Sequence, residues 1–224
     1  MRTHRLGAFT LLETVVAMAL LLLVIGLGVR FMIPAMRASV RSTLRVEMEQ
    51  QAVTALNRLV TDLKRTSPPG ISVRSGPPPV AVGVCPISTP GMRPGVPRPV
   101  QPDGTLVWSS FFILYYLDDA SDQFRRREWP QGSVPPTPEE VAVSKPRRLS
   151  PGRLGQVLSG TGTREQVLAT GVQSFEILYP PGGSDQLVVQ PLRFRIRLER
   201  RGNTGGRGPE TFTYSRTVFV RNQR

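Results

Sequence analysis

The feature that most constrains this chain is an apolar run near its N-terminus. No charged residue lies in 14–29, and the longer stretch 9–33 is interrupted only by Glu13 and Arg30. A helix of about 20 apolar residues crosses the hydrocarbon core of a bilayer. The sequence therefore predicts a transmembrane helix at about residues 9–33, followed by a domain on one side of a membrane.

Basic residues before this run indicate its orientation. Arg2, His4 and Arg5 precede it, and positive charge tends to stay on the cytoplasmic side. Arginines 30, 37, 41 and 45 follow it, which weakens the asymmetry. We expect the N-terminus to be cytoplasmic and the rest of the chain to be exported. A secretory signal peptide is the alternative, but its best cleavage site, 35–38, lies inside a continuing amphipathic pattern.

The segment Gly7-Ala8-Phe9-Thr10-Leu11-Leu12-Glu13 resembles the processing signal of type IV prepilins and pseudopilins. In that family, prepilin peptidase cuts on the cytoplasmic side of the apolar run. The new N-terminal Phe is then N-methylated, and Glu is the fifth mature residue. The resemblance implies a leader at 1–8, a cut between Ala8 and Phe9, and N-methylated Phe9. A cut between Gly7 and Ala8 is the alternative, because the family usually has Gly before the cut.

Glu13 is expected to act in assembly. A carboxylate in an apolar run costs free energy unless it is paired or lies near the interface. In a fibre of this family, Glu13 can pair with the freed amine of Phe9 on a neighbouring subunit, where the low dielectric strengthens the pair. The alternative is a Glu13 side chain that reaches the lipid headgroups.

The helical pattern continues beyond the membrane segment. Apolar residues recur at steps of three and four from Val40 to Leu63, whereas charged residues such as Glu49 and Asp62 fall off that stripe. This predicts an amphipathic helix over 35–66, so that the N-terminal helix covers 9–66 in all. Pro34 predicts a two-part helix, loosened or kinked where the chain leaves the membrane.

Residues 67–224 predict a β-rich exported head. Half of the 22 prolines lie in 67–104, which we expect to be irregular except for a short strand at 80–84. A second irregular excursion is expected at 133–163. The strands predicted from alternating apolar residues are 106–117, 123–129, 173–179, 192–199 and 212–221. The predicted fold is α+β and pilin-like, with the long helix packed on one antiparallel β-sheet.

The later segments are similar to J-type minor pseudopilins and W-type minor pilins. The similarity lies in a Tyr-rich strand at 115–117, an Arg-rich return at 125–127, and the blocks 168–179 and 217–222. Cys85 is the only cysteine, so no intramolecular disulfide can close a C-terminal loop as in many major pilins. These features favour a minor subunit.

Residue types needed for catalysis are scarce. His4 is the only histidine, and the predicted leader contains it. Neither a His-based triad nor a Cys–His pair is therefore expected in the mature chain, and there is no phosphate-binding Gly-rich motif. We expect no enzyme, cofactor or metal centre. Asp118, Asp119 and Asp122 carry oxygen ligands suited to Ca²⁺, but we interpret them as the residues of a hairpin turn.

The formal net charge of +13, almost all of it from arginine, suits anionic partners. Clusters at Arg125, Arg126, Arg127 and at Arg193, Arg195, Arg197 are candidates for contact with DNA phosphates, with Trp129 and Tyr214 as stacking residues. The alternatives are a solvated basic surface, contact with acidic neighbours in a fibre, and a genomic bias towards arginine.

Together these features predict a structural subunit of a type IV pilus, a competence pseudopilus or a type II secretion pseudopilus. The implied partners are prepilin peptidase, other pilins, the inner-membrane assembly platform and membrane lipid. We expect a single pass through the bacterial cytoplasmic membrane, followed by assembly at the cell envelope or surface. The alternative function is a pilus-tip subunit that captures DNA during natural transformation.

Overall fold

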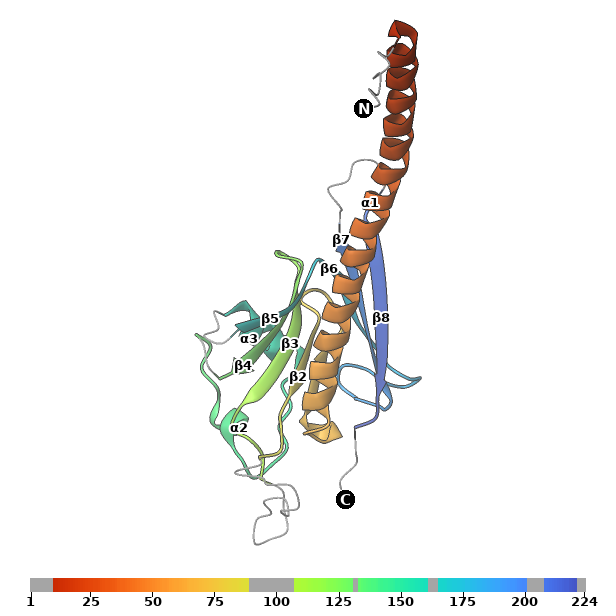
Figure 1. Ribbon diagram of the computed structural model, residues 1–224. Helices are drawn as coiled ribbons and strands as arrows, with labels where there is room; N and C mark the ends of the chain where they lie inside the picture. Colours follow the sequence, from red (N-terminus) through yellow and green to blue (C-terminus); the bar gives the residue numbers. More distant parts are fainter. Residues whose placement is uncertain (1–9, 89–106, 131–132, 161–164, 201–207, 221–224) are drawn as a thin grey trace, which may run out of the picture.

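The computed structural model describes residues 10–88, 107–130, 133–160, 165–200 and 208–220. A long N-terminal helix, α1 (Leu11–Leu63), runs along a β-rich head and projects well beyond it (Figure 1). Its 53 residues correspond to about 80 Å. The predicted α+β layout, a long apolar N-terminal helix packed on antiparallel β-structure, is confirmed.

No break occurs in α1 at Pro34, which excludes the loosened form of the predicted two-part helix. Pro34 lies inside one continuous helix, which begins after the N-cap Thr10 and ends before the C-cap Lys64. A proline removes only its own backbone donor, and the turns on either side keep their hydrogen bonds. The two halves of α1 are therefore one rod, and the position of one half determines the position of the other.

The head contains two antiparallel sheets, where one was predicted. The five-stranded sheet has the order β1 (Ile71–Arg74), β2 (Ala81–Val84), β3 (Phe112–Asp118), β4 (Gln123–Trp129), β5 (Glu165–Thr170). The three-stranded sheet has the order β6 (Val172–Leu178), β7 (Leu192–Arg200), β8 (Glu210–Val218). The chain passes from one sheet to the other at Gly171, whose φ of 70° is the left-handed conformation that glycine adopts readily.

Several predicted elements are confirmed, and others were missed. The short strand near 80–84, the hairpin of β3 and β4, and the strand near 192–199 are all present. The predicted excursions contain more structure than expected: β1 in the first, and in the second a short helix, α2 (Pro138–Val141), and a longer one, α3 (Pro151–Ser159). The side chain of Ser150 caps α3, and Leu154, Val157 and Leu158 bury one face of it. A turn of 3₁₀-helix, η1 (Pro68–Gly70), follows α1.

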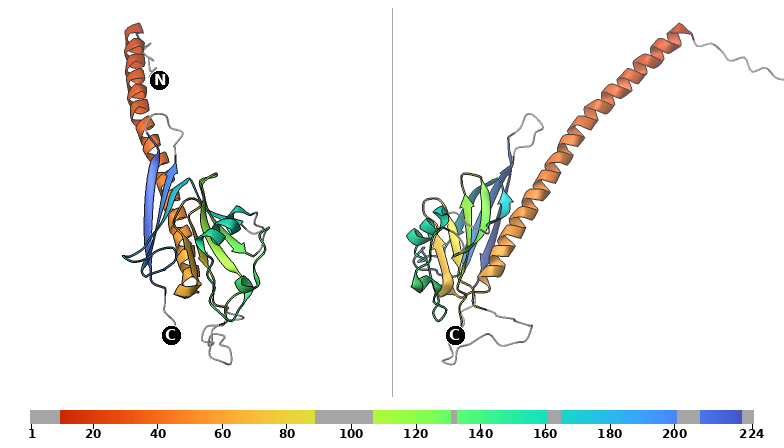
Figure 2. Two further views of the ribbon diagram at one scale, coloured as in Figure 1. Left: turned by 180° about the vertical axis from the view of Figure 1, so that it is seen from behind. Right: turned by 90° about the vertical axis from the view of Figure 1, so that its left-hand side faces the viewer.

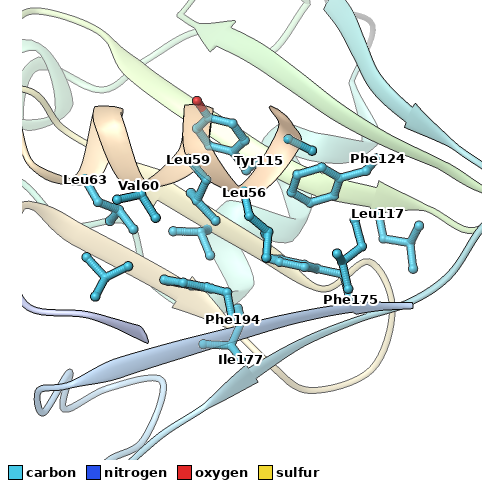
Figure 3. Packing of buried hydrophobic residues seen from close by; sticks show 14 of the residues in the cluster. Leu56, Leu59, Val60, Leu63, Tyr115, Leu117, Phe124, Phe175, Ile177 and Phe194 are labelled. Atoms are coloured by element: carbon cyan, nitrogen blue, oxygen red, sulfur yellow. The ribbon is translucent and has the colours of Figure 1, made fainter. Parts of the chain in front are cut away.

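The main core lies between the C-terminal half of α1 and the two sheets. Figure 3 shows Leu56, Leu59 and Leu63 of the helix beside aromatic side chains of both sheets. The rings of Phe124 and Phe175 are 4.7 Å apart and join the two sheets directly. A second, smaller core fills the space between the five-stranded sheet and α3. The head is thus held to only the lower half of the helix.

Candidate functional site

The N-terminal half of α1 makes no packing contact with the head (Figures 1 and 2). Every large apolar side chain from Leu11 to Ile33 is exposed, and the most apolar window of 18 residues has a mean hydropathy of 2.5 and is 0% buried. This helix is long and apolar enough to span a membrane. An apolar surface of this extent is unfavourable in water, and it needs lipid or other helices around it.

A reciprocal capping box starts this helix. The Thr10 backbone N–H donates to the Glu13 carboxylate at 2.9 Å, and the Glu13 N–H donates to the Thr10 hydroxyl at 3.3 Å. Sequence reasoning missed this role, although the Thr-x-x-Glu spacing is its known signature. Phe9 and both predicted cuts, Ala8/Phe9 and Gly7/Ala8, lie outside the described residues. Glu13 is exposed at the amino end of the apolar rod.

A buried polar cluster attaches the C-terminal half of α1 to the head. Asp62 is 1% exposed, so the prediction that it lies off the buried stripe is wrong. Its carboxylate accepts a hydrogen bond of 2.6 Å from the Tyr115 hydroxyl and one of 3.2 Å from Arg126 Nε. Burial, together with the neighbouring Asp62 carboxylate, raises the pKa of Tyr115. Buried charges are tolerated only when they are paired in this way.

Contacts from β7 and β8 extend this attachment along the helix. Arg200 pairs with Glu47 at 2.9 Å and donates to Gln51 at 3.2 Å. Arg216, on the inner face of β8, donates to the Asn57 side chain. These contacts lie between Glu47 and Asp62 on the helix. Before Glu47, the ion pair to the head among the described residues is the one of 3.7 Å between Arg41 and Glu210.

The arginines at 125–127 do not form the predicted strip, because they point to different sides of β4. Arg125 pairs with Asp118 at 3.1 Å and with Glu165 at 3.0 Å, and Arg126 pairs with Asp62 and Glu128. Arg127 is fully buried and donates to the Gly160 carbonyl at 2.7 Å. Trp129 is also fully buried, so its ring has no face free for stacking. This cluster is neutralised within the head.

The second arginine cluster does form a row on one surface. Arg193, Arg195 and Arg197 point outward from β7, opposite the buried face of that strand. Their partners on β8 form a hydroxyl row: Thr217, Ser215 and Thr213. Arg195 pairs with Glu176 at 3.1 Å. Tyr214 lies on the other face of the sheet, packed against the core, and so does not join this row.

The acidic residues at 118–122 form a hairpin turn. The carboxylate of Asp118 accepts from the Ala120 N–H at 3.3 Å and from the Ser121 hydroxyl at 2.6 Å, and it pairs with Arg125. Asp122 has a φ of 50°, typical of a turn residue. No group of three His, Cys, Asp or Glu side chains spaced to hold a metal occurs in the described part of the chain.

A pocket of about 720 Å³ lies between α2 and the start of α3. Its lining is strongly charged, and Arg153 pairs with Glu140 across it at 2.8 Å. Cys85 is fully buried beside Arg147, one of the lining residues, and burial raises the pKa of the thiol. A thiol of this kind is unreactive because the thiolate is the nucleophilic form. The Glu140 carboxylate in this lining is occupied by Arg153 and by the backbone N–H of Thr137.

No family model, curated protein or solved structure matches this chain. The functional interpretation therefore depends on the residues and their geometry. Two features stand out: the exposed apolar half of α1, and its rigid connection to a folded head.

Proposed function

We propose that this chain is a minor pilin or pseudopilin, a structural rather than enzymatic subunit of a type IV pilus, a competence pseudopilus or a type II secretion pseudopilus. One observation carries the proposal. A continuous helix is attached to a β-rich head along its lower half, while residues 11–33 expose a mainly apolar surface with Glu13 and Arg30 as its only charges. The prepilin-type signal at 7–13 stands directly before this apolar surface.

The two halves of α1 would serve successive stages. In the precursor, the apolar half anchors the chain in the cytoplasmic membrane, with the N-terminus in the cytoplasm and the head exported. In the assembled fibre, the same apolar surface packs against helices of sister subunits in place of lipid. The rigid lower half keeps the head at a constant distance from that helical core, on the outside of the fibre.

The partners of the proposal follow from these stages. Prepilin peptidase would cut between Ala8 and Phe9 and leave N-methylated Phe9, with the Gly7/Ala8 cut as the alternative. The inner-membrane assembly platform would then extract the subunit from the membrane. Glu13 is exposed at the amino end of the helix, where it can meet the amine of a neighbouring Phe9. That pairing would draw the new subunit into register.

The test uses three variants in the producing strain. Ala8→Lys should accumulate as the uncut precursor, and Glu13→Ala should be cut normally but fail to enter fibres. Glu49→Ala, which removes an exposed carboxylate lower on the same helix, is the matched control and should be cut and assembled. N-terminal sequencing reports the cut, and sheared surface material or secreted protein reports assembly. Unchanged assembly in both of the first two variants would contradict the proposal.

A DNA-capturing tip subunit is a second candidate function. It is favoured by the outward row of Arg193, Arg195 and Arg197 beside the hydroxyls of β8, a surface suited to phosphate oxygens. Full-length protein in detergent should bind DNA in a gel-shift assay with strong salt dependence. Arg193→Gln with Arg197→Gln should reduce the salt slope by about 2. Binding that is independent of salt, or that is unchanged in this double variant, would exclude this function.

A further inference from the structure

A stripe of arginines follows the apolar half of α1. It consists of Arg30, Arg37, Arg41 and Arg45, and all four side chains are at least partly exposed. At about 100° per residue, these positions lie within an arc of about 80° on the helix surface. Four arginines on one face, directly after a segment that can span a membrane, form a distinct surface, here named the arginine stripe.

The arginine stripe is not neutralised by the chain itself. No Asp or Glu occurs between Glu13 and Glu47, a stretch that contains all four arginines. Among the described residues, the single ion pair of the stripe joins Arg41 to Glu210 at 3.7 Å, with both side chains 40% exposed. An exposed pair at this distance contributes little. The stripe therefore presents three to four positive charges that have no strong internal partner.

The stripe faces the same side of the helix as the head. Its arc also contains Met48, Ala52, Ala55 and Leu59, which pack into the core farther down the helix. The stripe thus lies on the head-facing side of the helix, and the right-hand view of Figure 2 shows how the projecting half of α1 leaves the head. A membrane crossed by the apolar half would lie directly above this angle.

We propose that the arginine stripe binds the phosphate groups of anionic lipids in the leaflet on the head side of the membrane. The inference rests on the proposed membrane anchoring of α1. Arginine binds phosphate oxygens with a planar fork and can extend its apolar stem along the membrane interface. An anionic membrane surface attracts basic residues, and each one near the surface strengthens binding by about fivefold.

The length of the arginine stripe affects how the whole molecule sits on the membrane. From Arg30 to Arg45 the helix rises about 22 Å, whereas the headgroup layer on each side of a bilayer is only about 5–8 Å thick. An upright helix would bring only the upper arginines to the phosphates. A lean of α1 towards the side that bears the head, together with the reach of the long arginine side chains, brings more of the stripe to the phosphates and lowers the head towards the membrane. Anionic lipid is then a determinant of head position before assembly.

A second copy of this chain fits the stripe less well than lipid does. Parallel helices of the same chain have no carboxylate at the level of the stripe, since none occurs between Glu13 and Glu47. Two stripes placed together would repel each other. Lipid phosphates, in contrast, are continuous along the surface from which the helix emerges.

The test measures how deeply the stripe lies in the headgroup layer. Full-length Ala38→Cys, with buried Cys85 replaced by Ala, carries a nitroxide beside the stripe. The protein is reconstituted into nanodiscs of phosphatidylcholine, or of the same lipid with one third replaced by phosphatidylglycerol. We expect phosphatidylglycerol to protect the label from a water-soluble relaxation agent. High salt should reverse this protection, since it shortens the screening length.

Matched variants assign the effect to the stripe. Arg37→Gln, Arg41→Gln and Arg45→Gln together should abolish protection, because about fivefold per arginine amounts to roughly a 100-fold shift of the docking equilibrium. Arg30 is kept so that insertion is unaffected. The control removes three exposed charges outside the stripe, Arg58→Gln, Lys64→Gln and Lys145→Gln, and should retain protection. Inorganic phosphate added to the neutral nanodiscs should protect nothing.

The outcomes separate this inference from the function on which it rests. Co-elution of the chain with nanodiscs reports insertion independently of the label. A chain that does not insert overturns both proposals. A chain that inserts but shows equal label accessibility in the two lipids, or equal protection in the stripe variant and the control, overturns the arginine-stripe proposal alone.

Discussion

The Tyr115 hydroxyl donates a 2.6 Å hydrogen bond to the carboxylate of Asp62, and both groups are buried between α1 and the five-stranded sheet. Arg126 approaches the same carboxylate from β4 at 3.2 Å. This contact fixes the register of the helix on the head. Because α1 is continuous, the contact also fixes how far the apolar end projects, although the two regions are far apart.

Removal of Asp62 should therefore destabilise the head strongly. We expect Asp62→Ala to lower the free energy of unfolding by about 3 kcal/mol, because it leaves the partly buried Arg126 with a single remaining carboxylate partner, Glu128. Tyr115→Phe should cost about 1–2 kcal/mol, and the exposed control Glu49→Ala less than about 0.5 kcal/mol. Urea unfolding in detergent, followed by the fluorescence of the buried head residues Trp108 and Trp129, measures all three. Equal stability of Asp62→Ala and Glu49→Ala would contradict this role.

Alkaline pH should destabilise the head through its buried tyrosines. Burial, and the hydrogen bond that Tyr116 donates to Glu165, raise the pKa of Tyr116 to about 12 from its usual value of about 10. The unfolded chain then releases this proton first, so the stabilisation is complete below about pH 10 and is lost as the pH rises to about 12. The loss should reach about 2–3 kcal/mol, since each unit of pKa shift corresponds to about 1.4 kcal/mol.

The Tyr116→Phe variant provides the control for this linkage. Its unfolding free energy should fall less steeply over the same pH range, while tyrosinate absorbance shows one fewer late-titrating group. Tyr115 and Tyr179 also have a raised pKa, so part of the decline will persist. An identical pH slope in the variant and the parent would rule out the assignment to Tyr116.

The junction of the two sheets should be intolerant of a side chain. Gly171 has a φ of 70°, and a Cβ there would lie 2.7 Å from the Glu199 carbonyl oxygen. We expect Gly171→Ala to destabilise by about 2–3 kcal/mol through strain and this clash. Gly152→Ala in α3, where a Cβ meets nothing within 4 Å, should instead stabilise by about 0.5 kcal/mol. Thermal unfolding of the two variants, measured in parallel, tests this difference. Similar melting temperatures would contradict the proposed intolerance at Gly171.

Glu13→Gln separates the two roles available to Glu13. Glutamine at this position keeps the capping box with Thr10 but removes the charge. Under the proposed function, Glu13→Gln is cut normally yet assembles as poorly as Glu13→Ala, because the amine of a neighbouring Phe9 needs an ionised partner. Quantification of sheared fibres provides the readout. Normal assembly of Glu13→Gln would assign the residue to helix initiation alone.

Local patterns predicted part of this fold well. Alternating apolar residues identified β7, and the acidic turn between two strands identified the β3–β4 hairpin. The missed elements are short or lie in Pro- and Gly-rich sequence: β1 has four residues, and α3 begins with a proline. In both, long-range packing compensates for a weak local signal, since Val73 and Leu154 are completely buried.

The residues of the candidate site also fall into two groups, those whose structure local sequence predicts and those whose structure it does not. The apolar run of the first helix and the T-x-x-E motif at its start are local, because helix periodicity and capping depend on neighbours within four residues. Whether each charged residue is exposed or buried could not be predicted from the sequence. Asp62 and Arg127 resemble exposed residues in the sequence, yet both are buried, because partners more than 30 positions away neutralise or hydrogen-bond them.

Local sequence was enough to predict a long helical segment near the N-terminus, a first half apolar enough to span a membrane, and strands after it. These properties are set by the order of neighbouring side chains. Long-range packing, in contrast, sets which arginines form ion pairs within the head and which remain exposed. That outcome depends on which strands pair and which helical face they cover, and hence on contacts between residues that the sequence keeps apart.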